Sequence, residues 1–431
     1  LEYRHLLNNQ AANMFDFKRT KKALLNFYRV ADLSLFGELE PVIFAALGAL
    51  IEYLQLTQKD NLPPLTFPKN QAAQKYLAID SATYRHLEIF TNQGELKKAN
   101  LLTVIDHTVT AAGGRLLEEL LRYPLLEPKA IEARLNLVSA CYQNESFTNQ
   151  LRELLKASLD LERQLVKISQ NQASGRQLLM IAKSLMVAQE IKALIANNNL
   201  PKLNKISQDL PALAELDQQL QIISETAPAL LSKGNLLKTG VDQRLDYLRN
   251  LRQKQEVLLA DLASQYQQMT KINNLRIKHN NLLGYVIEVN KNQAAKMPET
   301  VFRHRQTLLN AIRFSSHELD QLEAELLKAE EEIWQIELAH FERLTEAIMQ
   351  HYDQLKQVAR ILARLDCVSS FAVLARLEGY VRPIIKTDQK LLIKGGFHPV
   401  VAKFLPEHEP EFTKNDSYFD QKERLMLLTG P

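Results

Sequence analysis

A short basic segment, residues 275–315, has the residue types that can bind a polyanion. It holds seven Lys and Arg residues but only two acidic ones, Glu288 and Glu299, a net charge of +5, while the whole chain carries +3. Lys, Arg, Asn, Gln and Thr side chains are the usual ligands of nucleic-acid phosphates. The candidate DNA-backbone residues are Lys278, Asn280, Asn281, Lys291, Lys296, Arg303, Arg305, Gln306, Thr307, Asn310 and Arg313. We therefore predict a local polyanion contact here.

The alternative is that each basic residue is an ordinary solvated surface charge. Concentration of the charge in one segment of an otherwise balanced chain, with 53 basic and 50 acidic residues, favours a binding surface. The segment has few aromatic residues, and we expect Tyr285, Phe302 and Phe314 to form its core. Single-stranded nucleic acid requires interleaved aromatic platforms, so the pattern favours contact with a duplex backbone.

Two long helical patterns flank the basic segment and must position it. The first starts near Val241 and continues to Ile272 without Pro or Gly; the second covers residues 316–349. About 34 helical residues would span about 50 Å. Between these arms, alternation over residues 275–289 predicts a hairpin, and residues 306–314 a further strand. Three consecutive glutamates at 330–332 are expected to be a solvated face.

Length and composition indicate a multidomain, mainly helical protein. At 431 residues the chain is longer than a single core usually supports, and its thirteen glycines are few for a fold rich in sheets. Only Cys141 and Cys367 are present, which excludes a disulfide framework and favours a reducing, cytoplasmic setting. The ten histidines show no spacing typical of a metal site. The apolar residues 41–56 are too few for a membrane span of about 20 residues, so we expect no membrane contact.

Other parts of the chain have simpler patterns. Residues 18–33 and 41–56 predict helices, and residues 57–70, with three prolines, predict a linker. We expect a strand at 76–80, a helix at 82–90 capped by Ser81, and repeated helices to about residue 197.

After Gly379 short apolar runs at 380–385, 391–393 and 425–428 predict the opening of a sheet. A strand followed by Thr429, Gly430 and Pro431 is typical of the start of a phosphate-binding loop. No complete G-x-x-x-x-G-K-[ST] motif occurs, so we expect no catalytic residue in this chain.

Several motifs in order resemble those of the MutS family of DNA mismatch-repair proteins. They are LAID (77–80), LLTVIDHTVT (101–110), GRLL (114–117), DLER (160–163), NLLGYVI (281–287), RQTL (305–308), HPVV (398–401) and LTGP (428–431). The resemblance extends over nearly the whole chain after Lys75.

The resemblance implies a domain for each part of the chain. It implies the end of a connector domain (1–64), a helical core with the first lever helix (65–260), a clamp domain (261–320), a second lever helix returning to the core (321–378) and the start of an ATPase domain (379–431). The expected fold is mainly α: a helical core with two long lever helices, a small β-containing clamp between them, and the opening strands of an α/β ATPase domain. We expect a fragment that lacks the mismatch-reading domain and most of the ATPase domain.

The function implied is DNA mismatch repair, with this region holding mismatched duplex DNA and coupling it to an ATPase. For the full-length protein the family implies ATP and Mg²⁺ as cofactors, binding of double-stranded DNA with mismatches or small loops, a homodimer, a MutL-type repair partner and a cytoplasmic, nucleoid-associated location. Nucleotide contacts are implied for Phe412, Thr429, Gly430 and Pro431, and for Phe412 the alternative is a buried core residue. This chain alone is expected to be inactive and to hold no cofactor. The alternatives are a non-enzymatic helical scaffold or coiled-coil arm, and a MutS relative acting in recombination.

Overall fold

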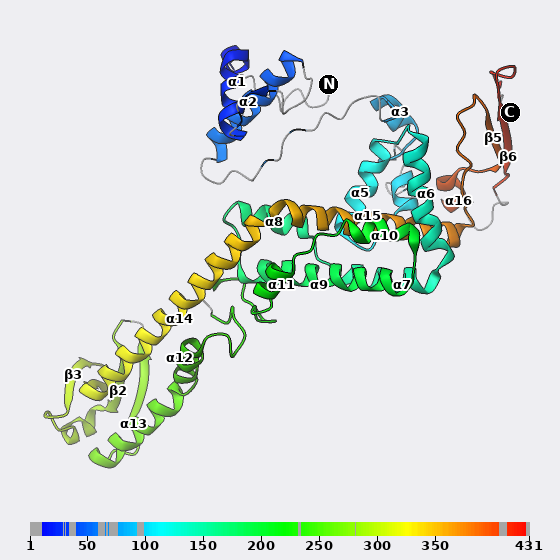
Figure 1. Ribbon diagram of the computed structural model, residues 1–431. Coiled ribbons are helices and arrows are strands. Elements are labelled where there is room, and N and C mark those ends of the chain that lie inside the picture. Colours follow the sequence, from blue (N-terminus) through cyan, green and yellow to red (C-terminus); the bar gives the residue numbers. More distant parts are fainter. Residues whose placement is uncertain are drawn as a thin grey trace. The chain divides into compact units, whose positions relative to one another are not determined.

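The computed structural model describes residues 11–28, 30, 32–33, 40–58, 65, 68, 76–92, 99–231, 234–280, 282–404 and 412–427. Its residues form two compact units. Unit 1 contains Leu1–Ala173, Met180–Asp217 and His351–Pro431, and unit 2 contains Ser174–Leu179 and Gln218–Gln350. Helices make up most of both units (Figure 1), which confirms the predicted mainly α class.

The N-terminal part is a pair of helices. A 3₁₀ turn, η2 (Ala12–Phe15), precedes α1 (Phe17–Tyr28) and α2 (Pro41–Gln58), and Leu24, Phe44 and Ile51 form the contact between the two helices. Pro41 begins α2, as predicted, because its missing N–H has no partner in a first turn. By length and apolar composition α2 is the one helix of the described residues that could cross a membrane. One face of α2 packs against α1, and Val42, Leu50 and Leu56 are exposed.

The rest of unit 1 is a helical core around one long helix, α15 (Tyr352–Glu378), which packs against four others and buries fourteen of its residues. The helices lying wholly or mostly in this unit are α3 (Ser81–His86), α4 (Leu101–Ile105), α5 (Ala111–Arg122), α6 (Pro128–Gln143), α7 (Glu145–Ala157), α8 (Leu161–Ser169), α9 (Gly175–Asn197), α10 (Pro201–Gln208), α11 (Ala214–Leu220) and α15. Gly379, at positive φ, ends α15 where the sequence pattern also changes.

The structure near residue 80 agrees only in part with the prediction from the sequence. Asp80 caps α3 by accepting a hydrogen bond from Thr83, so the predicted cap at Ser81 is wrong by one residue. The helix ends at His86, and Glu88 has a φ of +48°. The strand predicted at 76–80 is a single bridge from Tyr76 to Leu125.

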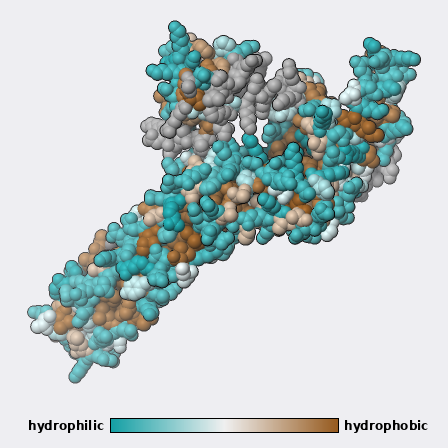
Figure 2. All heavy atoms as spheres, in the orientation of Figure 1, coloured by the Kyte–Doolittle hydropathy of each residue, from teal (hydrophilic) through white to brown (hydrophobic). Residues whose placement is uncertain are grey.

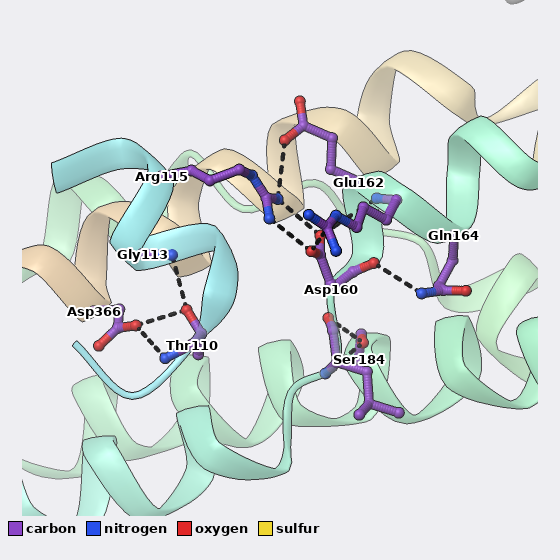
Figure 3. Close-up of polar contacts among 10 residues, drawn as sticks. Thr110, Gly113, Arg115, Asp160, Glu162, Gln164, Ser184 and Asp366 are labelled. Carbon is purple, nitrogen blue, oxygen red and sulfur yellow. Dashed lines mark hydrogen bonds and ion pairs between the residues drawn. The ribbon is translucent and has the colours of Figure 1, made fainter. Parts of the chain in front are cut away.

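A buried carboxylate organises the centre of unit 1. Asp366 on α15 is fully buried and accepts hydrogen bonds from the backbone N–H groups of Val109 and Thr110 and from the Thr110 hydroxyl, at 3.0, 2.8 and 2.6 Å. Thr110 in turn caps α5 through Gly113, as Figure 3 shows. The loop at residues 106–110 is therefore tied to a helix more than 250 residues later in the chain.

Unit 2 consists of a helix pair and a small sheet. Its helices are α12 (Gln243–Gln253), α13 (Gln255–Thr270) and α14 (His317–Gln350), and α12 lies beside α14 (Figure 1). The first arm was predicted as uninterrupted, but it divides at Lys254 although neither Pro nor Gly is present. The second arm has the predicted position, with 34 residues. Ser316 accepts a hydrogen bond from Leu319 at its start.

The C-terminal part contains β5 (Leu391–Gly396), α16 (Pro399–Phe404) and β6 (Asn415–Phe419), with β5 and β6 antiparallel. The strand predicted at 391–393 is present. Residues 380–385 form no strand, because Pro383 has no N–H to donate to a ladder. Of the strand predicted at 425–428, residues 425–427 are described and unpaired, and residue 428 lies outside the described residues.

Candidate nucleic-acid interface

The basic segment folds as a four-stranded antiparallel sheet in unit 2. Its strands are β1 (Arg276–Asn280), β2 (Gly284–Asn290), β3 (Phe302–Thr307) and β4 (Ala311–Ser316), in the order β1-β2-β4-β3, and the 3₁₀ turn η6 (Lys291–Lys296) connects β2 toward β3. The hairpin predicted at 275–289 is confirmed. The single strand predicted at 306–314 is two strands joined by a turn at 308–310.

One face of this sheet is apolar and anchors it. Ile287, Val289 and Phe314 point into a core completed by Tyr266 of α13 and Leu319 of α14. The Tyr266 ring meets the ring of Phe302 edge to face at 5.1 Å between centroids. Phe302 and Phe314 are thus buried as predicted, and Tyr285 is half-buried. Alternation along each strand leaves the other face for polar side chains.

That other face carries a polar ladder across all four strands. The register places Arg276 opposite Glu288, Glu288 opposite Arg313, and Arg313 opposite Gln306. Glu288 accepts from Lys278 at 2.6 Å and from Arg313 at 3.4 Å, and Arg313 donates to Gln306 at 2.9 Å. Two of the predicted phosphate ligands, Lys278 and Arg313, therefore share an internal carboxylate.

Two further predicted ligands are paired with a helix. Arg303 forms an ion pair with Asp320 in the first turn of α14, and Arg305 lies 3.6 Å from the same carboxylate while donating to Ser315 at 3.0 Å. Asp320 lies just beyond the basic segment 275–315, so the net charge of that segment does not include it. Acidic residues are favoured in the first turn of a helix. The sequence therefore did indicate an acidic residue, Asp320, next to the basic segment.

Three basic residues of the segment are exposed and unpaired. Within the described part of the chain no carboxylate forms an ion pair with Arg276, Lys291 or Lys296. The backbone N–H of Lys291 donates to the carbonyl of Asn310, at 3.3 Å, so η6 and the turn at 308–310 meet at one end of the sheet. Figure 2 shows that the visible face of unit 2 is largely hydrophilic, with separate hydrophobic patches.

The remaining predicted residues have local roles or no described position. Asn280 accepts hydrogen bonds from the backbone of Leu282 and Leu283 and so shapes the β1–β2 turn. The Thr307 hydroxyl is 2.8 Å from the His304 ring. Asn310 is exposed in its turn. Asn281 lies outside the described residues.

The helix pair α12 and α14 is joined by ion pairs. Arg244 pairs with Glu332 through two hydrogen bonds of 2.7 Å, and Arg252 lies 3.6 Å from Glu330. Glu330 and Glu331 are exposed, as expected for a solvated face, and Glu332 is half-exposed in its pair with Arg244. A deeper pair joins Arg249 to Glu337 at 2.6 Å, where Glu337 is fully buried.

The predicted nucleotide site is only partly described. Phe412 packs against Phe397, with ring centroids 6.5 Å apart, and Phe397 also meets Tyr380. Thr429, Gly430 and Pro431 lie outside the described residues. Among the described residues no group of His, Cys, Asp or Glu could hold a metal ion.

Two family models match the chain. The model for MutS domain III matches residues 82–372, and the model for MutS domain II matches residues 1–66. The domain III match covers more than half of the chain, including the whole sheet and both arms. The chain belongs to the MutS family.

Curated MutS relatives extend the same match. The DNA mismatch repair protein MutS of Rickettsia prowazekii (strain Madrid E) is 36% identical over 428 residues, which cover 98% of this chain and 48% of the relative. The proteins of the same name from Rickettsia bellii (strain OSU 85-389) and Rickettsia rickettsii (strain Sheila Smith) are each 35% identical over 427 residues, with the same coverage. The chain thus spans about half the length of these MutS relatives.

Proposed function

We propose that this chain is the DNA-holding region of a MutS-type mismatch-repair ATPase, and that the sheet of unit 2 binds the backbone of a duplex. The observation that carries the proposal is a set of three exposed, unpaired cations, Arg276 on β1 and Lys291 and Lys296 at the two ends of η6. Membership of the MutS family and the names of the curated relatives support it.

We infer that the predicted ligands contribute unequally to duplex binding, because some of them are already paired with carboxylates. A phosphate can approach Arg276, Lys291 or Lys296 without displacing a carboxylate. It must compete with Asp320 for Arg303 and Arg305, and with Glu288 for Lys278 and Arg313. We therefore assign most of the binding to the three unpaired cations, with the other basic residues and Gln306, Thr307 and Asn310 contributing less.

For the full-length protein the proposal includes ATP binding and hydrolysis with Mg²⁺. Phe412 would pack on adenine, and residues 429–431 would begin the phosphate-binding loop. The same proposal includes recognition of mismatches or small loops, a homodimer, a MutL-type partner and a cytoplasmic location near the nucleoid. The proposed domain limits are those of the family: connector, core with levers, clamp and ATPase.

The alternative of a coiled-coil scaffold has less support. A coiled coil would use the apolar stripe of α14 to bind a second chain. Leu319, Leu326, Ala329 and Ile333 on that stripe are already buried within this chain. A role in recombination is the other alternative, and the curated relatives, which are named for mismatch repair, favour repair over it.

The test is duplex binding by a charge-reversed variant. Fluorescence anisotropy with a labelled duplex would compare the wild-type chain with a variant carrying Arg276→Glu, Lys291→Glu and Lys296→Glu. We expect at least about tenfold weaker binding at low salt. The salt slope should become shallower by about 0.9 for each phosphate that the variant no longer neutralises.

The matched control reverses Lys129, Lys167 and Lys202, three exposed lysines on helices of unit 1. It changes the net charge equally and should retain wild-type affinity. Equal losses in both variants would show that only total charge matters, and unchanged affinity in the first would refute the proposed interface.

A further inference from the structure

A cavity of about 760 Å³ lies within unit 1 among α5, α6 and α15. Its wall is mainly apolar, with Leu116, Leu125 and Phe371 among the lining residues, and alanines at several positions leave the space open. The volume is in the range of pockets that bind small molecules, which are commonly apolar with a few polar groups. Nothing in the proposed DNA contact uses this cavity.

Three arginines line the cavity without an acidic partner. They are Arg134 from α6 and Arg360 and Arg364 from α15, and no carboxylate of the described chain forms an ion pair with any of them. Arg134 is half-buried. Burial lowers its pKa, and the positive charge of Arg364 nearby lowers it further. The half-buried charge of Arg134 thus lies near a second positive charge on the exposed Arg364, an arrangement that a bound anion would stabilise.

The other charged groups at the cavity do not supply that compensation. Figure 3 shows Arg115 directed at Asp160, with hydrogen bonds of 2.7 and 2.9 Å, and Glu162 lies 3.6 Å from the same guanidinium. Glu162 is therefore engaged by Arg115. Glu119, the other acidic residue of the lining, is exposed and forms no ion pair with Arg134 or Arg364 in the described part of the chain. The cavity keeps an excess of positive charge.

We infer that this cavity binds a small phosphate monoester with an apolar or aromatic body, held by the guanidinium groups of Arg134 and Arg364. Guanidinium groups are suited to phosphate oxygens because they offer paired N–H donors in one plane. The apolar wall would cover the body of the ligand and exclude water. A phosphomonoester carries more charge than a phosphodiester, so the site should prefer it over a nucleic-acid backbone.

Isothermal calorimetry on the full chain tests this with 1-naphthyl phosphate as the probe. We expect saturable binding below about 1 mM and weaker binding of inorganic phosphate, which lacks the apolar body. Neutral 1-naphthol should not bind. Equal binding of naphthol would overturn the inference, because only the apolar wall would then matter, and absence of naphthyl phosphate binding would overturn it as well.

Two variants locate the site. Arg364 is exposed, so Arg364→Gln should leave folding intact, and Arg134→Gln removes the partly buried partner. Each should weaken naphthyl phosphate binding by about tenfold or more, the usual effect of removing a charged hydrogen bond. Arg85→Gln, at an exposed position outside the cavity, is the matched control and should bind normally. Wild-type affinity in Arg364→Gln would overturn the inference, as would displacement of the probe by a short DNA duplex.

Discussion

Glu288 decides how much of the basic sheet is available to an external anion. It holds Lys278 and Arg313, and the hydrogen bond from Lys278, together with the charges of both cations, keeps the pKa of Glu288 below its ordinary value. Glu288→Gln would remove one negative charge and release two cations. We expect tighter duplex binding and a salt slope steeper by about 0.9 for each cation that binds a phosphate in consequence, measured by anisotropy.

The same substitution should alter stability in a pH-dependent way. A carboxyl group whose pKa is lowered by folding stabilises the folded state above its unfolded pKa and loses that contribution as the pH falls through its folded pKa. The wild-type chain should therefore be more stable than Glu288→Gln at neutral pH, and the difference should vanish in acid. A difference that grows as the pH falls would contradict the assigned ion pairs.

Two adjacent glycines on α5 give a second prediction at the residue scale. A Cβ at Gly113 would lie 2.2 Å from the buried Asp366 carboxylate oxygen, whereas at Gly114 the nearest side-chain atom is 3.5 Å away. Gly113→Ala should cost about 1–3 kcal/mol through overpacking. Gly114→Ala should be neutral or stabilise by up to about 1 kcal/mol, since Ala favours helix. Urea unfolding measures both, and equal effects would rule out the close approach at Gly113.

At the scale of elements, the pair α12 and α14 depends on one buried contact more than on its surface contacts. Glu337 is fully buried and accepts hydrogen bonds from Arg249 and from the backbone of Asn235 and Leu236, at 2.6, 2.8 and 3.2 Å. Arg249→Met would leave that charge without its partner.

We expect Arg249→Met to destabilise unit 2 by about 3–5 kcal/mol, as is typical when one partner of a buried ion pair is removed. Arg244→Met removes the exposed pair with Glu332 and should cost at most about 1 kcal/mol. Chemical denaturation monitored by the single Trp334, which lies on α14 near these contacts in sequence, would compare the two. Similar losses of stability in the two variants would mean that the buried Arg249–Glu337 pair contributes no more than the exposed Arg244–Glu332 pair.

The elements also show what a sequence pattern can predict. α14 was predicted almost to the residue because its apolar spacing, its Ser316 start and its lack of Pro are all local signals. The division at Lys254 and the two strands in place of one at 306–314 were missed. Helix and strand boundaries of that kind depend on neighbours in space, such as the register of β3 against β4.

For the whole molecule, the mainly helical class could be predicted from the composition, and the family from the order of the motifs along the chain. Which basic residues are paired with carboxylates could not be predicted from either. The partners of Arg303, Arg305 and Arg313 come from Asp320 and from cross-strand register. Asp366 and the loop it holds are separated by more than 250 residues. Residue counts along the sequence cannot identify such pairs, so the ion-pair partners of the basic residues could not be predicted. That these residues bind a duplex stays a prediction.

The pairing of Arg303 and Arg305 with Asp320 has a kinetic consequence. On the proposed function, Arg276, Lys291 and Lys296 are free at first encounter and set the association rate, which salt would slow. Arg303 and Arg305 can reach a phosphate only after exchanging Asp320 for it, a rearrangement within the encounter complex. They would therefore act on the dissociation rate. A duplex that fits poorly would dissociate before Arg303 and Arg305 exchange Asp320 for a phosphate. A duplex that is still bound when this exchange occurs would then dissociate more slowly.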